Sequence, residues 1–248
     1  MDIIAGRLSR GGRLFYIGAG TSGRLAVLDA SELPPTFGVP PSLVQGIIAG
    51  GRCALTRAVE GAEDRTRRGV RDLRARRFSA KDALVGLTAS GSTPYVLGAL
   101  RYARRRGAAT VAVTCNRPSA VARIADVTIA PLTGPEVLAG STRLKAGTAQ
   151  KLVLNMLSSA VMIRLGHVYD NLMINVARTN RKLRRRAVRV LEQAAGVSTS
   201  AAAHALRQAG HDSRVALVML ERCLDARSAR RMLSASGNDL RTALTERR

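Results

Sequence analysis

Short apolar runs alternate with helical patterns over the first 135 residues, and this alternation constrains the fold more than any other feature. The runs are almost continuously apolar, as strands covered on both faces of a sheet are. Strands and helices in alternation predict an α/β fold, with a parallel sheet between helical layers of the flavodoxin-like or Rossmann-like kind. The expected strands are 13–19, 44–49, 83–89, 109–115 and 127–131, and the expected helices are 23–31, 64–76, 94–106 and 119–124.

The pattern changes after residue 142. Two long helical patterns follow, at 145–166 and 179–195. Hydroxyl side chains at 198–200 are typical N-caps, and they precede three or four short helices that end near residue 245. We therefore expect two domains: an α/β domain over residues 1–196 and a small helical bundle over residues 197–248.

The charge balance is strongly basic, with 40 Lys+Arg against 17 Asp+Glu and a net charge of +23. Such a balance favours a nucleic-acid or membrane-surface partner. However, aromatic residues make up only 3% of the chain and tryptophan is absent, so a base-stacking surface is poorly supplied. The basic residues are also spread from Arg7 to Arg248. We therefore expect no nucleic-acid partner.

The same sequence predicts a soluble, cytoplasmic protein. No apolar leader follows Met1, and the longest mostly apolar stretch, 152–165, is interrupted by polar residues and is too short to span a bilayer. The three cysteines lie far apart, without the spacing of a disulfide framework or a metal site, which favours a reducing compartment.

Two loops rich in glycine and hydroxyl groups follow expected strands. Residues 18–23 (GAGTSG) satisfy the dinucleotide-binding pattern, but the second strand ends in Ala49 and two glycines, with no carboxylate for a ribose. Hydroxyls and backbone N–H groups at a helix N-terminus also suit a phosphate monoester, and residues 90–93 (SGST) repeat the arrangement. A phosphorylated small molecule at the carboxyl edge of the sheet is therefore the favoured ligand, with simple helix capping as the alternative.

Four segments resemble the N-acetylmuramic acid 6-phosphate etherases of the sugar isomerase (SIS) family. They are 18–38 (GAGTSGRLAVLDASELPPTFG), 58–65 (AVEGAEDR), 89–96 (ASGSTPYV) and 140–158 (GSTRLKAGTAQKLVLNMLS). The similarity continues in order to the C-terminus. It implies an SIS-type sheet, a homodimer, and hydrolysis of the D-lactyl ether of N-acetylmuramate 6-phosphate in cell-wall amino sugar recycling.

The resemblance also implies roles for individual residues. Glu32 matches the family's proton donor and Glu63 its second acidic catalytic residue, so we expect Glu32 to act as acid and Glu63 as base. General acid–base steps of this kind require no metal or redox cofactor. The expected binding residues are Thr21, Ser22, Ser90, Ser92 and Thr93 for the phosphate, Lys145 across the cleft, and Glu136 at sugar hydroxyls; a surface ion pair is the alternative for Lys145 and Glu136.

Two departures from the family pattern stand out. Ser92 occupies a position where the family usually has arginine, and a helical segment that normally precedes the first strand is lacking. Two other functions stay open. A sugar-phosphate sensor would keep the hydroxyl loops without needing both glutamates, and an SIS-containing nucleic-acid-binding regulator would need a helix-turn-helix module, which the sequence does not show.

Overall fold

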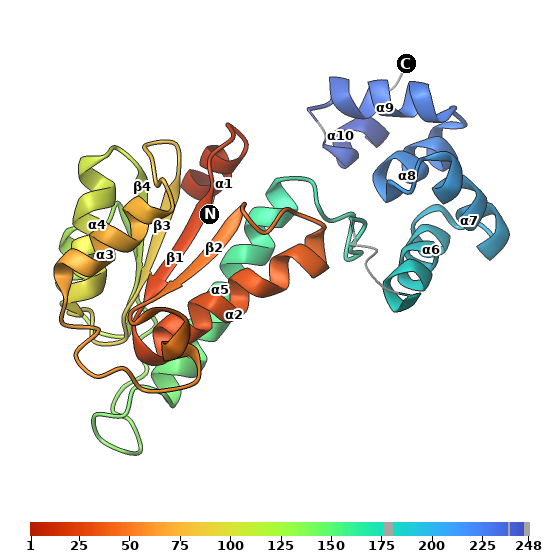
Figure 1. Cartoon of the computed structure of the whole chain (residues 1–248). Coiled ribbons are helices and arrows are strands. Elements are labelled where there is room, and N and C mark those ends of the chain that lie inside the picture. The colour runs from red at the N-terminus through yellow and green to blue at the C-terminus, as the bar shows by residue number, and fades with distance from the viewer. Residues whose placement is uncertain (176–180, 238, 246–248) are drawn as a thin grey trace. The chain divides into compact units, whose positions relative to one another are not determined.

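The computed structural model describes residues 1–175, 181–237 and 239–245 (Figure 1). The chain divides into two compact units, one of Met1–Leu33 with Pro40–Val161 and one of Pro34–Val39 with Met162–Arg248. This division differs from the boundary expected at residue 196. The reason is helix α6 (Arg181–Ala195), whose Ala187 and Leu191 belong to the same apolar core as the later helices.

A five-stranded parallel sheet in the order β2-β1-β3-β4-β5 forms the centre of the first unit. Every residue of β1, β3 and β4 is buried, which explains why these strands are continuously apolar in sequence. The predicted α/β fold is therefore confirmed. The strands are β1 (Leu14–Gly18), β2 (Val44–Ile48), β3 (Ala83–Leu87), β4 (Ala109–Val113) and β5 (Val127–Ile129).

Helices cover both faces of this sheet (Figure 1). Phe15 and Ile17 of β1 point to one face and pack in a core with Leu73 of α3 and Leu100 of α4. Helices α2 and α5 lie together on the opposite face. The helices and short 3₁₀ turns of this part are α1 (Asp2–Leu8), α2 (Gly20–Phe37), η1 (Gly51–Leu55), α3 (Thr66–Ala75), α4 (Pro94–Arg105), η2 (Val121–Arg123) and α5 (Lys145–Arg164).

Three elements differ from the expected ones. Helix α1 was not predicted, and the helix expected at 119–124 is only the 3₁₀ turn η2. Helix α2 is longer than expected and includes Pro34 and Pro35. Proline's fixed φ is compatible with a helix, although it removes a backbone donor. The Gly38 N–H donates to the carbonyl oxygen of Pro34 at 3.0 Å, and the positive φ of Gly38 ends the helix.

The second unit contains a small helical bundle. Its described helices share one apolar core, and three of them begin at side-chain N-caps, Ser198, Asp212 and Asp225. None of the helices in the described ranges has the length and apolar character needed to cross a membrane. After α6 come α7 (Thr199–Gln208), α8 (Ser213–Arg222), α9 (Ala226–Ala235) and α10 (Leu240–Thr245).

Candidate active site

The strand order places a ligand site between β1 and β3. From β1 the chain moves to β2 on one side, and the later strands add on the other side. In open parallel sheets, ligands bind outside the carboxyl ends of the strands at such a reversal. The two hydroxyl loops predicted from the sequence follow these two strands, because β1 ends at Gly18 and β3 ends at Leu87.

A cavity of about 390 Å³ lies at this edge. It receives residues from both loops and from the segment that precedes α3. The structure therefore brings together all five residues predicted to hold the phosphate and one of the two predicted catalytic glutamates. They are Thr21, Ser22, Ser90, Ser92, Thr93 and Glu63.

The loop after β1 turns directly into α2 because two glycines allow the strand and helix to approach closely. A Cβ atom on Gly23 would lie 2.7 Å from the carbonyl oxygen of Gly18 and 2.6 Å from the side chain of Ile48. The helix therefore begins right at the edge of the sheet. Its N-terminal N–H groups and the positive end of its dipole suit an anion there.

The loop after β3 is organised around Thr88. The Thr88 hydroxyl lies 2.8 Å from the hydroxyl of Thr93 and 3.3 Å from that of Ser90, and it accepts a hydrogen bond from the Gly91 N–H at 3.2 Å. Ser92 Oγ donates to Ser90 Oγ at 3.1 Å. The hydroxyl groups are thus already gathered before any ligand arrives. Thr88 was missed in the sequence, where its signal is a polar residue directly after an apolar strand.

Buried side-chain hydrogen bonds join α2 to α5 behind the first loop. Ser22 Oγ donates to Oε1 of Gln150 at 2.7 Å, and Ser158 Oγ donates to Oδ1 of Asp29 at 3.2 Å. Burial raises the pKa of Asp29. Gln150 was also missed, because nothing in the sequence distinguishes it from a glutamine on a solvated helix face.

Glu32 does not line this cavity. Its side chain is exposed near the end of α2, twelve residues after Gly20. At a rise of 1.5 Å per residue, the two positions are about 18 Å apart along the helix axis. Among the cavities described in this chain, Glu63 lines two and Glu32 lines neither of them.

Glu136 and Lys145 meet at the start of α5. Both carboxylate oxygens of Glu136 accept backbone N–H groups, from Lys145 and Ala146, each at 2.9 Å. The hydrogen bond from Ala146 is the main reason why the pKa of Glu136 is lowered. Glu136 is therefore a helix cap in this structure. Neither Glu136 nor the exposed Lys145 is among the described residues that line the cavity.

Within the described ranges, no three or more His, Cys, Asp or Glu side chains are grouped so that they could hold a metal ion. The cavity residues described above carry hydroxyl and carboxylate groups. They suit hydrogen bonding to a phosphate and proton transfer by a carboxylate.

Two family models and several solved structures are similar to parts of this chain. The model of the glucokinase regulatory protein N-terminal SIS domain matches residues 1–104, and the SIS domain model matches residues 71–160. A phosphoheptose isomerase from Neisseria gonorrhoeae is similar in structure, at 17% identity over 64% of this chain and 81% of that one, with a TM-score of 0.48.

Much closer sequence relatives are the N-acetylmuramic acid 6-phosphate etherases of Yersinia pestis (strain Pestoides F) and Yersinia pseudotuberculosis (serotype O:1b, strain IP 31758). Each is 56% identical to this chain over 244 residues, which are 98% of this chain and 83% of the relative. Identity at this level over nearly the whole chain means that the protein belongs to the N-acetylmuramic acid 6-phosphate etherase family.

Proposed function

We propose that this protein cleaves the D-lactyl ether of N-acetylmuramate 6-phosphate, giving N-acetylglucosamine 6-phosphate and D-lactate. The observation that carries the proposal is the cavity that joins both hydroxyl loops to Glu63, in a chain 56% identical to etherases. The reaction belongs to the recycling of cell-wall amino sugars, and we place it in the cytoplasm, where such sugar phosphates arise.

The hydroxyl loops would hold the 6-phosphate. A phosphate oxygen only accepts hydrogen bonds, and the loops offer the hydroxyls of Thr21, Ser90 and Thr93 together with the first N–H groups of α2. Several donors converging on one anion give specificity for a phosphorylated sugar, because hydrogen bonds to a charged group contribute about 1.5–3 kcal/mol each.

Two carboxyl groups suffice for the chemistry. In the ring-opened sugar, the C1 aldehyde acidifies the C2 proton, and the lactyl ether oxygen on C3 is a β-leaving group. Glu63 takes the C2 proton while the C3–O bond breaks, a C2–C3 double bond forms, and Glu32 gives its proton to the departing lactate. Water then adds its oxygen to C3 while Glu32 takes one of its protons, and Glu63 returns a proton to C2, so both carboxyl groups regain their starting states.

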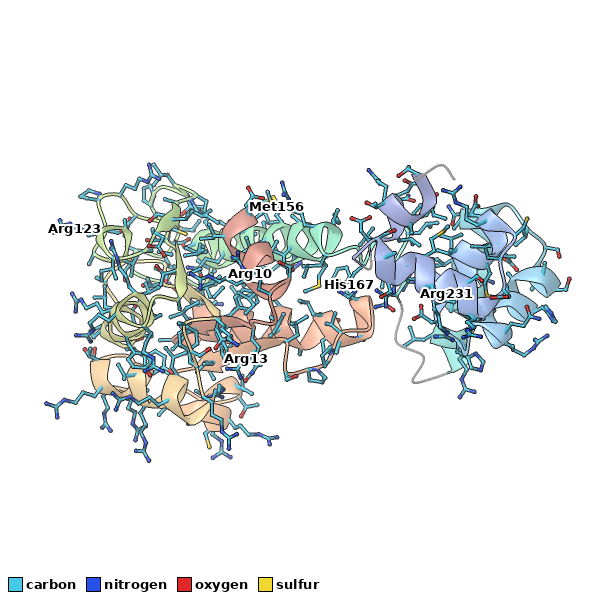
Figure 2. The ribbon with its side chains drawn as sticks, turned by 90° about the horizontal axis from the view of Figure 1, so that it is seen from above. Arg10, Arg13, Arg123, Met156, His167 and Arg231 are labelled. Atoms are coloured by element: carbon cyan, nitrogen blue, oxygen red, sulfur yellow. The ribbon has the colours of Figure 1, made fainter. Side chains whose placement is uncertain are left out.

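The position of Glu32 calls for a second subunit. Glu32 is separated from the cavity of its own chain, and Leu28, one helical turn before it, is exposed on α2. On α5, Leu152 and Met156 are exposed as well, Met156 by 63% (Figure 2). Exposed apolar side chains on two helices that pack against each other suit a contact surface for a second subunit. We propose a homodimer in which Glu32 of one subunit completes the cavity that holds Glu63 of the other.

The activity is tested by incubating the protein with N-acetylmuramate 6-phosphate and measuring D-lactate. Glu32→Gln and Glu63→Gln should each abolish release, whereas Glu60→Gln, an exposed carboxylate in the same segment as Glu63, should leave most of it. Tight binding of the sugar phosphate without any lactate would instead indicate a sensor of the kind matched by the regulatory-protein model.

Mixing the two inactive variants tests the shared site. If each site takes Glu32 from one subunit and Glu63 from the other, a mixed dimer of Glu32→Gln and Glu63→Gln has one intact site and one doubly altered site. Random mixing should then restore roughly a quarter of the wild-type activity. No restoration in subunits shown to exchange would place both glutamates of a site on one chain.

A further inference from the structure

The hydroxyl of Ser22 donates its hydrogen bond to a buried glutamine. Ser22 lines the cavity, yet it is only 8% exposed and its Oγ donates to Oε1 of Gln150 at 2.7 Å. Gln150 is completely buried on the second turn of α5. The two helices are close here, because a Cβ on Gly147 would lie 3.3 Å from Cγ2 of Thr21. The Ser22–Gln150 contact is therefore held by packing.

This hydrogen bond has the wrong polarity for a phosphate. A serine hydroxyl has one hydrogen and otherwise only lone pairs, and a phosphate oxygen needs a donor. With its hydrogen on Gln150, Ser22 presents only lone pairs to the cavity. Ser22 can bind the phosphate only if its hydrogen is released from Gln150.

The other end of the Gln150 amide shows how that release is possible. Nε2 is buried and has no hydrogen-bond partner in the described structure. A buried donor without a partner is costly. Turning the amide by half a turn exchanges Oε1 and Nε2, so that Nε2 donates to Ser22 Oγ and gains the partner it lacks.

We propose that Gln150 is a positioning residue of the phosphate site, which turns its amide when the ligand binds so that Ser22 donates to a phosphate oxygen. Gln150 does not touch the ligand and acts through Ser22. No covalent bond changes in this step. The inference rests on the proposed function only in taking a sugar phosphate as the ligand of the cavity.

NMR of the glutamine side chains measures the turning of the Gln150 amide directly. It contains four glutamines, so a protein labelled with ¹⁵N-glutamine shows four side-chain amide groups, and the Gln150→Met variant identifies the one of interest. N-acetylglucosamine 6-phosphate should move the Gln150 NH₂ protons downfield and slow their exchange with water. N-acetylglucosamine without phosphate should do neither. A Gln150 signal that stays unchanged while the cavity fills with sugar phosphate would refute the proposal.

Binding of N-acetylglucosamine 6-phosphate to variants gives a second test. Gln150→Met removes the acceptor that holds the Ser22 hydrogen, so Ser22 stays free to donate and the Kd should remain close to the wild-type value. Gln150→Glu, whose ionised carboxylate can only accept, should keep that hydrogen and raise the Kd about 10-fold or more, the value of one hydrogen bond to a charged group. Ser22→Ala should raise the Kd to a similar extent, and adding Gln150→Met to it should change the Kd no further, because the interaction is already lost. In the D-lactate assay, the KM of Gln150→Glu and of Ser22→Ala should rise while kcat changes little.

Gln45→Met on the edge strand β2 is the matched control and should bind like the wild type, since Gln45 lies outside the cavity. A Gln150→Glu protein that binds like the wild type, or a Gln150→Met protein that binds as weakly as Ser22→Ala, would contradict the role of Gln150. A wild-type protein that neither binds the sugar phosphate nor releases lactate would contradict the proposed function instead. If Gln150→Met does not fold, replacing Gln45, Gln193 and Gln208 one at a time assigns the other three amide signals, so the remaining signal is that of Gln150 and the NMR experiment still decides the matter.

Discussion

Asp82 joins the amino ends of the two strands whose carboxyl ends carry the hydroxyl loops, and we predict that Asp82→Asn destabilises the first unit. Only 2% of its side chain is exposed. It accepts from Arg13 three times: from the backbone N–H at 2.9 Å, from Nε at 3.1 Å and from Nη2 at 2.9 Å. The backbone N–H and the hydroxyl of Ser79 donate to it as well, at 2.8 and 3.1 Å.

The size of the effect follows from these contacts. Asparagine keeps one acceptor oxygen, but its NH₂ group would face the donors of Arg13 and Ser79 that now reach Oδ2. Breaking a buried ion pair costs about 3–5 kcal/mol. Arg13 is 29% exposed, so solvent screening reduces this to about 3 kcal/mol. For a protein of this size, that is a fall in Tm of roughly 6–12 °C.

The pH dependence gives a sharper check. Burial alone would raise the pKa of Asp82, but the hydrogen bonds from Arg13 and Ser79 outweigh it and hold the pKa below the usual value. A carboxyl whose pKa is lowered by folding stabilises the protein above its unfolded pKa, near 4, and this contribution is lost as the pH falls through the folded value. The wild type should therefore lose its advantage over Asp82→Asn in acid.

Urea unfolding at pH 7 and at a series of pH values below 4 measures the loss of unfolding free energy in Asp82→Asn and its dependence on pH. Asp64→Asn, at an exposed aspartate of the same unit, should unfold close to the wild type. A loss below about 1 kcal/mol for Asp82→Asn at pH 7 would refute the argument from buried contacts. A difference that stays the same down to the lowest pH would refute the assignment of the ionised carboxylate.

Three further predictions concern the loop, the interface and the bundle. Gly23→Ala should destabilise the protein by about 1–3 kcal/mol and weaken sugar-phosphate binding, because its Cβ would lie 2.7 Å from a backbone oxygen. Gly20→Ala has open space around its Cβ and should cost only about 1 kcal/mol, because of its positive φ. Thermal unfolding and binding assays compare the two variants. Met156→Asp should shift the dimer toward monomer in light scattering and lower activity in parallel, and a dimer that persists at low concentration would exclude α5 as the interface. Asp212→Ala should lower the unfolding free energy of the second unit by about 1 kcal/mol, because Asp212 accepts the first N–H groups of α8.

The sheet was predictable mainly because its three inner strands, β1, β3 and β4, are buried on both faces. Burial makes a parallel strand continuously apolar, and all five strands lie where the apolar runs predicted them. The features that were missed depend on tertiary contacts. The domain boundary shifted because the apolar face of α6 packs with the later helices, and no local pattern says which neighbour an amphipathic helix will choose.

The site was predictable to a similar extent. Two hydroxyl loops after neighbouring parallel strands must meet at one edge of the sheet, and the structure brings them together around one cavity. The distance of Glu32 from that cavity follows from its place twelve residues along α2, and the helix expected at 23–31 already implies most of this separation. Buried polar residues such as Thr88 and Gln150 are recognisable only through their partners, which a sequence does not display.

The net charge of +23 contributes less to this site than its size suggests. Among the described residues that line the cavity, none is arginine or lysine, while Glu63 and Asp64 are both acidic. Basic side chains are spread over the chain, as Arg10 and Arg123 illustrate (Figure 2). Four other arginines, Arg52, Arg68, Arg71 and Arg76, line a different cavity at the β2 edge of the sheet. Arg24 and Arg57 line a neighbouring cavity that shares Ala19, Gly20 and Glu63 with the site. Within one chain, the donors that line the site itself are therefore neutral, and basic side chains contribute from outside its lining, where salt weakens their effect.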